Sequence, residues 1–386
     1  MSSASHSRYR KIVLGTLTLV LTGAVLEAGA RLLLHFGASS ADFEKYASAA
    51  QLRARLGEYS RFQVHRHLGY CLAPDYQRDN NRHNSLGFRG EEFAKPKPPG
   101  TLRIVCAGAS TTYGEGVVSD FRLSYPHMLQ LALRAKGLAV EVINAGCPGW
   151  TTLETLINFQ TRVLDLEPDV VIVYHGINDA ISRIVWPPDA YRSDHSGWLS
   201  RRDALQTEPL WESSTLVRFL LVRAGVIEPQ ASMFRIVGDV PPSSHTFEFR
   251  TQRIQGRYPD GVFREVPVEQ MLDANPPIFF ERNLRSLIAV AAANRVRVVL
   301  TTFAISRAFP DQSYTGYPAI QKAVEATNEI VRRLTRETSA QLFDLVKLLP
   351  EDKSLFTDGM HFTAAGNYKR VELLLPWLAQ ELQIGR

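Results

Sequence analysis

One short stretch constrains the fold more than any other: an apolar run, rich in β-branched residues, that ends abruptly in a hydroxyl-rich turn. The run is Leu102–Cys106, and the turn Gly108–Thr112 follows at once. Such a run is typical of a strand buried on both faces of a parallel sheet. Open α/β sheets place their sites at the carboxyl ends of strands. Ser110 is therefore a candidate functional residue, although a serine beside a glycine after a strand is also common in ordinary turns.

The alternation of strand, polar turn and helix continues along the chain. Further strands are predicted at Val140–Ile143, Val170–Tyr174, Val296–Thr301 and Gln341–Phe343. Helical spacing of apolar residues follows them or lies between them at Tyr125–Lys136, Thr151–Leu166, Phe279–Asn294, Tyr317–Thr338 and Thr363–Leu382. About five strands, each with a helix after it, predict an α/β fold, a three-layer α/β/α sandwich around a parallel sheet.

The alternation fails between residues 181 and 277, where prolines recur and only one helix, Thr215–Ala224, is predicted. By its length this tract is an insertion, and it begins directly after the third strand. It is too aromatic for a disordered linker. Its rings form either a small satellite core or a lid and substrate wall: Trp186, Trp198, Trp211, Phe219, Phe234 and Tyr258.

The amino terminus carries an apolar segment with basic residues before it. Ile12–Leu26 is uncharged and follows Arg8, Arg10 and Lys11, which favours a cytoplasmic amino terminus and an exported remainder. Residues 12–34 reach the length of a membrane span if Glu27 and Arg31, spaced i, i+4, pair on one face. We expect an uncleaved anchor. The alternative is a signal peptide cleaved after Ala28-Gly-Ala30.

Length and composition set the division into domains and exclude some functions. We expect an anchor at 1–37, a polar connecting region at 38–100 and a catalytic domain at 101–386 that carries the insertion. The chain has 386 residues and a net charge of +5, of which the three basic residues before the apolar segment supply three. No nucleic-acid-binding surface is indicated. The three cysteines form no C-x-x-C pair, and no metal site is expected.

Polar turns follow three successive strands, and a fourth polar turn precedes the last helix. Sheet topology would bring all four to one edge. Ser110 could act as a nucleophile, His361 as a general base and Asp358 as the carboxylate that orients the imidazole. The side-chain amide of Asn178 and the backbone N–H groups of Gly149 and Ser110 could stabilise an oxyanion. Taken singly, each of these residues could belong to an ordinary turn or helix cap.

In this order and context, the four blocks resemble those of the SGNH (GDSL-type) hydrolases, especially their membrane-anchored bacterial members. The resemblance covers about Asn84 to Leu382. It implies a flavodoxin-like hydrolase fold, with Ser110, Asp358 and His361 as the triad and Ser110, Gly149 and Asn178 as the oxyanion donors. The usual aspartate before the serine is Ala109 here. Gly146 also fits the second block, but its spacing from Asn144 favours Gly149.

The expected function is that of a serine esterase, with no cofactor, that cleaves or transfers an O-acyl group through an acyl-enzyme. Export and anchoring in a bacterial inner membrane, with the catalytic domain facing the periplasm, suggest an acylated carbohydrate or lipid of the cell envelope as substrate. One alternative is an O-acyltransferase of an exported polysaccharide, which forms the same acyl-enzyme. Another is a catalytically silent, anchored carbohydrate-binding protein. An α/β-hydrolase is excluded because Thr112 stands where its G-x-S-x-G motif needs glycine.

Overall fold

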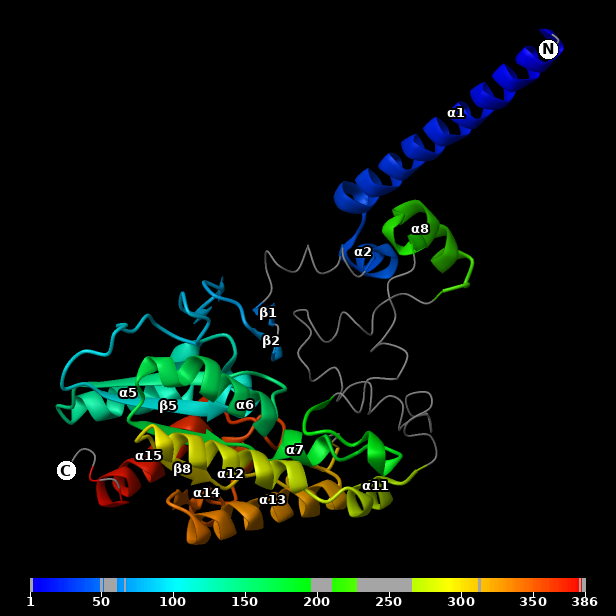
Figure 1. Ribbon diagram of the computed structural model, residues 1–386. Helices are drawn as coiled ribbons and strands as arrows, with labels where there is room; N and C mark the ends of the chain where they lie inside the picture. Colours follow the sequence, from blue (N-terminus) through cyan, green and yellow to red (C-terminus); the bar gives the residue numbers. More distant parts are fainter. Residues whose placement is uncertain are drawn as a thin grey trace. The chain divides into compact units, whose positions relative to one another are not determined.

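A five-stranded parallel sheet forms the centre of the catalytic part of the chain (Figure 1). The computed structural model describes residues 3–48, 51, 61–65, 67–195, 210–227, 266–311, 314–381 and 383. The strands are β5 (Leu102–Gly108), β6 (Val140–Gly146), β7 (Val170–Tyr174), β8 (Arg297–Thr301) and β9 (Gln341–Phe343). Their order is β6-β5-β7-β8-β9, and every pair is parallel. The predicted α/β/α sandwich of about five strands is confirmed.

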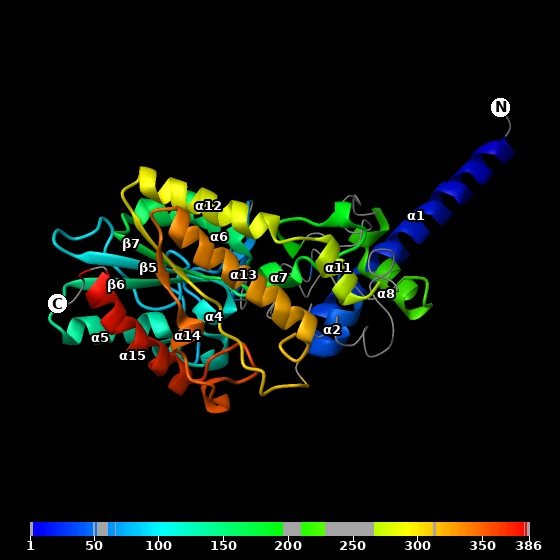
Figure 2. The ribbon, with the colours of Figure 1, turned by 90° about the horizontal axis from the view of Figure 1, so that it is seen from below.

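Helices cover both faces of the sheet, because successive side chains of each strand point to opposite sides. In β5, Ile104 and Cys106 pack into one buried cluster, while Val105 and Ala107 pack into another. On the first face lie α5 (Tyr125–Ala135) and α15 (Ala364–Glu381). On the second lie α6 (Thr152–Asn158), α12 (Ile278–Ala293) and α13 (Pro318–Glu337) (Figure 2). The strands are mostly apolar because both faces of the sheet are buried.

The helix expected over Thr151–Leu166 begins where predicted but does not stay regular. Thr151 is its N-cap and forms a capping box with Glu154. After Asn158 the backbone passes into a π-helical turn, Phe159–Val163, and then a 3-10 turn, Leu164–Leu166. Hydrophobic spacing fixes which face of such a segment is buried, but it does not fix the hydrogen-bond pattern in each turn.

The segment before the sheet forms small antiparallel pairs, where a polar connecting region was expected. β1 (Phe62–His65) pairs with β2 (Gly69–Leu72), and β3 (Gln77–Arg78) pairs with β4 (Asn81–Arg82). Phe62, Cys71 and Leu72 are buried in one cluster with Trp150 from the loop after β6. These residues therefore pack on the catalytic part of the chain.

The contacts divide the chain into two compact units. One comprises Met1–Tyr59 with Leu205–Val240, and the other comprises Ser60–Ala204 with Pro241–Arg386. The division groups part of the insertion with the amino terminus, which the expected domain boundaries did not do. Those boundaries, at 37, 100, 181 and 277, remain predictions.

The first unit is helical. It contains α1 (Ser3–Leu32), a π-helical turn η1 (Leu33–Gly37), α2 (Ser40–Tyr46), the 3-10 turn η8 (Leu210–Ser213) and α8 (Thr215–Arg223). By its length and apolar composition, the stretch Tyr9–Gly37 could cross a membrane, and a signal sequence would meet the same criteria. The helix predicted over Thr215–Ala224 is present as α8.

Both described ends of the insertion are held together at the base. Arg183 donates to the carbonyls of Asn275 and Leu272 at 2.6 Å each, and Asn275 Nδ2 donates back to the carbonyls of Arg183 and Val185 at 2.8 Å each. Arg183 and Asn275 are both buried. Trp198, Phe234 and Tyr258 lie outside the described residues.

Candidate active site

The turn that carries Ser110 joins β5 to a single helical turn, α4 (Ser110–Tyr113). The chain turns tightly here. A Cβ on Gly108 would lie 2.7 Å from the carbonyl oxygen of Tyr174, so only glycine fits at this position. Ser110 and Thr111 begin α4, and the N–H groups of first-turn residues have no acceptor within their helix. The turn thus presents both the Ser110 hydroxyl and a free backbone donor at the end of the sheet.

The sheet register brings the predicted blocks to one edge. Gly108, the last residue of β5, lies opposite Gly146 of β6 and Tyr174 of β7. The turns that follow these three strands are therefore neighbours. The predicted convergence of Ser110, Gly149 and Asn178 at the carboxyl edge has its structural basis in this register.

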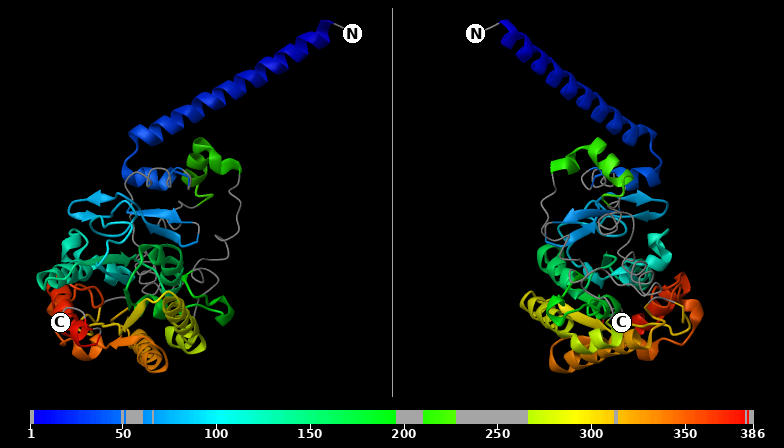
Figure 3. Two further views of the ribbon diagram at one scale, coloured as in Figure 1. Left: turned by 60° about the vertical axis from the view of Figure 1, so that its left-hand side comes forward. Right: turned by 90° about the vertical axis from the view of Figure 1, so that its right-hand side faces the viewer.

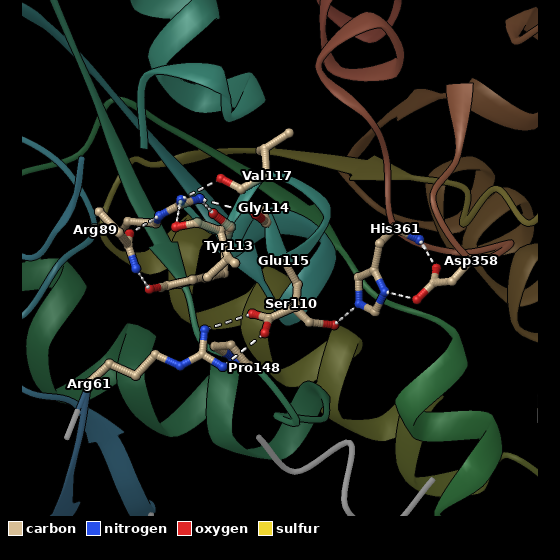
Figure 4. A network of polar contacts seen from close by, with 12 residues as sticks. Arg61, Arg89, Ser110, Tyr113, Gly114, Glu115, Val117, Pro148, Asp358 and His361 are labelled. Atoms are coloured by element: carbon tan, nitrogen blue, oxygen red, sulfur yellow. Dashed lines mark hydrogen bonds and ion pairs between the residues drawn. The ribbon is translucent and has the colours of Figure 1, made fainter. Parts of the chain in front are cut away.

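Ser110, His361 and Asp358 form a continuous chain of hydrogen bonds (Figure 4). His361 Nε2 lies 2.8 Å from Ser110 Oγ, and His361 Nδ1 lies 2.6 Å from Asp358 Oδ2. An ionised carboxylate only accepts, so Nδ1 carries the proton of the neutral imidazole and Nε2 accepts from the serine hydroxyl. This is the tautomer that a general base needs.

Backbone groups fix the carboxylate in place. Asp358 Oδ1 accepts from the N–H of His361 at 2.9 Å and from that of Met360 at 3.2 Å. Gly359 has a φ of +86°, and a Cβ there would lie 2.3 Å from Thr315 Oγ1. The Asp-Gly-Met-His turn is therefore a compact loop in which one oxygen of Asp358 holds the backbone and the other orients the imidazole.

The charges around His361 favour its protonated form. Burial alone would lower the pKa of His361, but the hydrogen bond and negative charge of Asp358, together with the charge of Glu115, raise it above its usual value. Burial would raise the pKa of Asp358, but the hydrogen bond and charge of His361 hold it below its usual value. The contacts that cause both pKa shifts favour the imidazolium–carboxylate pair, which would form if His361 took the proton of Ser110.

Gly149 and Asn178 are joined through the residue between the second block and α6. Asn178 Nδ2 donates to the carbonyl of Trp150 at 2.9 Å. This leaves the second N–H of the amide for another acceptor. Gly149 has a φ of +83°, which favours glycine. The N–H of Gly146 instead donates to Asn144 Oδ1 at 3.0 Å, so this glycine is used structurally and Gly149 is the better oxyanion candidate.

The residue after Asn178, Asp179, belongs to a buried polar network that the sequence did not predict. Asp179 Oδ1 accepts from the N–H of Thr152 at 3.0 Å and from its hydroxyl at 2.6 Å. Asn283 Nδ2 donates to the same hydroxyl at 3.1 Å, and His175 Nδ1 lies 3.7 Å from Asp179 Oδ2. Burial raises the pKa of Asp179 to about 7 and lowers that of His175 to about 3. The network ties the end of β7 to the start of α6.

Two arginines from the segment before the sheet hold the chain that follows Ser110. Arg61 forms a two-pronged pair with Glu115, at 3.0 and 2.8 Å (Figure 4). Arg89 donates to the carbonyls of Tyr113 and Val117, the latter at 3.0 Å. Glu115 stands only five residues after Ser110, whereas Arg61 and Arg89 lie in the expected connecting region 38–100. The closeness of Glu115 to Ser110 along the chain was the only sequence signal that could have pointed to this pairing.

Within the described ranges, no group of three or more His, Cys, Asp or Glu side chains gathers as metal ligands would. Cys71, Cys106 and Cys147 are buried and unpaired by disulfides. At this edge of the sheet, the described residues supply a hydroxyl, an imidazole, a carboxylate and backbone donors.

The α/β/α sandwich thus has a serine, a histidine and an aspartate joined by hydrogen bonds at the carboxyl edge of its sheet. The model of the GDSL-like lipase/acylhydrolase family matches residues 106–369, and the chain belongs to this family. It is accordingly a hydrolase that acts on ester bonds. No curated protein matches the chain in sequence.

Solved structures with a related fold are also known. A GDSL-like lipase from Bacteroides thetaiotaomicron is 14% identical over 72% of this chain and 88% of its own, with a TM-score of 0.39. A lipase/acylhydrolase from Enterococcus faecalis is 18% identical over 72% and 95%, with a TM-score of 0.38. An acetyl xylan esterase is 16% identical over 72% and 100%, with a TM-score of 0.39. These likenesses do not assign a substrate to this chain.

Proposed function

We propose that the protein is a serine esterase that removes an O-acyl group through an acyl-enzyme on Ser110. The observation that carries this proposal is the chain of hydrogen bonds from Ser110 through His361 to Asp358. Ser110 Oγ attacks the acyl carbon while His361 Nε2 takes the hydroxyl proton. The carboxylate of Asp358 and the charge of Glu115 stabilise the imidazolium, in keeping with the raised pKa of His361.

In the proposed mechanism, the tetrahedral intermediate places its negative charge against three donors. These are the backbone N–H groups of Ser110 and Gly149 and the free amide N–H of Asn178. His361 then gives its proton to the leaving alkoxide, and the carbon–oxygen bond to the alcohol breaks. Water, activated by the same imidazole, releases the acid and restores the serine. If a sugar hydroxyl attacks in place of water, the product is an acylated acceptor, and the enzyme is an acyltransferase.

We further propose that the enzyme is held in a bacterial inner membrane by residues 12–34 and that its substrate is an acylated carbohydrate or lipid of the cell envelope. Glu27 supports an uncleaved anchor: its carboxylate accepts from the N–H groups of Thr215 and Leu216 at 2.9 Å each. Cleavage after Ala30 would remove this residue and leave those donors without their acceptor.

The proposal is tested with the full-length protein, purified in detergent and assayed with p-nitrophenyl acetate. We expect Ser110→Ala to abolish hydrolysis while the circular dichroism spectrum and melting temperature stay those of the parent. Ser119→Ala, an exposed serine a few residues further on, is the matched control and should keep full activity. Full activity of Ser110→Ala would contradict the assignment.

Hydrolysis and transfer are distinguished in one further assay. The acyl-enzyme is generated from p-nitrophenyl acetate in the presence of an oligosaccharide from the producing strain's envelope. A hydrolase yields acetate in proportion to nitrophenol. An acyltransferase yields acetylated oligosaccharide, detected by mass spectrometry, and less acetate than nitrophenol.

A further inference from the structure

The apolar amino-terminal helix and a helix from the insertion are joined by a carboxylate. Glu27 of α1 accepts from the N–H groups of Thr215 and Leu216 and from the hydroxyl of Ser214, the last at 2.8 Å. Thr215 and Leu216 begin α8, so the carboxylate accepts from first-turn N–H groups that have no acceptor in their own helix. A negative charge at a helix N-terminus is also favoured by the helix dipole. Glu27 thus fixes where α8 begins along α1.

Further contacts keep α8 in this position. Arg31 pairs with Glu27 at 2.7 Å, as its spacing predicted, and also donates to the carbonyl of Ser213 at 2.8 Å. Arg218 Nε donates to the carbonyl of Ala47 at 2.8 Å. A small core links the elements of this unit, formed by Leu34, Phe43, Tyr46, Ala47 and Val222. Both views of Figure 3 show α8 beside the carboxyl-terminal end of α1.

Large apolar side chains of this small unit remain exposed outside α1. On α8, Val217 and Leu220 are 38% and 55% exposed, and Val226 just beyond the helix is 67% exposed. Val217 and Leu220 are spaced i, i+3 and therefore share one face. Near the end of the apolar stretch, Leu33 and Phe36 are exposed as well. Exposed apolar side chains that gather on one helix face, as Val217 and Leu220 do, indicate a contact with a membrane or another protein.

The position of Glu27 along α1 distinguishes these two partners. The proposed anchor covers residues 12–34, but its uncharged run ends at Leu26, and a span of about 20 residues counted from Ile12 ends at about Arg31. Glu27 lies one helical turn before that point, which is about 6 Å along the axis at 1.5 Å per residue. A helix whose first turn is bound at this depth lies in the boundary between acyl chains and headgroups.

We propose that α8 is an interfacial helix that rests on the outer surface of the bilayer, with Val217 and Leu220 among the phospholipid acyl chains. The inference rests on the proposed membrane anchoring by α1. It assigns to the insertion a second membrane contact, about 190 residues beyond the anchor in sequence. Interfacial helices bind by burying an apolar face in the headgroup boundary while their polar face stays in water. Here the polar groups at the start of α8 bind Glu27 of α1, and Arg218 of α8 binds the carbonyl of Ala47 at the end of α2.

The test uses single-cysteine labelling of the full-length protein in phosphatidylethanolamine–phosphatidylglycerol nanodiscs. The native cysteines are buried, so an added surface cysteine can be labelled selectively with the fluorophore NBD. Leu220→Cys reports on α8. Leu19→Cys, 76% exposed on α1, reports on the anchor, and Leu131→Cys, 52% exposed on α5, is the control for an exposed leucine of the catalytic part. Each is measured with and without lipid that carries a doxyl quencher at carbon 5 of the acyl chain.

We expect quenching at Leu19→Cys and Leu220→Cys and none at Leu131→Cys. Quenching at Leu19→Cys without quenching at Leu220→Cys would overturn the interfacial helix and leave the anchor intact. The absence of quenching at both sites would overturn the anchor itself. A blue-shifted but unquenched signal at Leu220→Cys would show that protein, either this chain or a second copy, covers the face, and would also overturn the inference.

Discussion

At the residue scale, the proposed mechanism depends on one proton of His361. With the hydrogen on Nδ1 held by Asp358, only neutral His361 can accept from Ser110 Oγ. Protonation of Nε2 removes that acceptor. The raised pKa of His361 therefore moves the loss of activity toward neutral pH, compared with an isolated imidazole.

Glu115 provides a test of this electrostatic arrangement. Hydrolysis needs the neutral imidazole, so kcat/KM should rise as the pH rises through the pKa of His361. Glu115→Gln removes a negative charge that stabilises the imidazolium, so the pKa should fall and the rise in kcat/KM should shift to lower pH. The measurement is kcat/KM for p-nitrophenyl acetate between pH 5 and 9. Glu372→Gln, an exposed acid paired with Lys369, is the control. A midpoint that stays in place or moves upward would refute the role given to Glu115.

Asn178 should contribute to the transition state more than to substrate binding. Asn178→Ala removes one of the proposed oxyanion donors, and we expect kcat to fall about a hundredfold or more. The substitution also removes the hydrogen bond to Trp150, so the melting temperature is measured alongside. An unchanged kcat with a raised KM would instead make Asn178 a substrate-binding residue.

At the element scale, the sequence predicts what depends on neighbours along the chain. The runs at 102–106 and 170–174 predict β5 and β7 because both faces of these strands are buried and the residues are β-branched. The hydrogen-bond chain between Ser110 and His361 joins residues 251 positions apart, and its residue types were predictable because the turns after parallel strands share an edge. No comparable relation between sequence and topology predicts the pairing of Arg61 with Glu115. It depends on where β1 packs, which local periodicity does not determine.

The contact between Glu27 and α8 illustrates the same limit and gives a prediction. Sequence spacing predicted the pair of Glu27 with Arg31 but not the capping of a helix 187 to 189 residues away. Glu27→Ala should cost about 1 kcal/mol locally, the usual worth of a helix cap. Hydrogen exchange of the amides of Thr215 and Leu216 should then quicken about fivefold. Glu372→Ala, on α15, is the control. Unchanged exchange would show that the core of this unit alone holds α8.

At the scale of the whole molecule, the insertion separates into parts with different environments. Its ends pack on the catalytic part. The rings of Tyr191 and Phe279 meet edge-on with their centroids 4.7 Å apart, and Met271 and Leu272 are buried. Its middle contains α8, which packs with α1 and α2. A single role for all of residues 181–277, as a lid or substrate wall, is therefore too simple for the described portions.

This arrangement determines how the proposed role in specificity is tested. Replacement of residues 196–265 by a Gly/Ser linker keeps Arg183, Asn275 and α11 (Val268–Ala274), which hold the base. We expect kcat/KM for p-nitrophenyl acetate to be preserved, while acetate release from the strain's own envelope polysaccharide and lipid is lost. Leu220→Glu in the otherwise complete chain separates loss of the membrane contact from loss of the rest. A folded, shortened protein that treats both substrates like the parent would show that the segment does not set specificity.

The clamp between Arg183 and Asn275 has a consequence for how such an enzyme can evolve. Because both residues are buried and bound to each other's backbone, the positions where the chain leaves and re-enters the sheet layer are fixed independently of what lies between them. We therefore expect that segments between these two points can be exchanged without a change in the register of β7 and β8. On this expectation, related enzymes can differ in the insertion, and with it in their cellular location or ester substrate, while the sheet that carries the hydrolytic site stays the same.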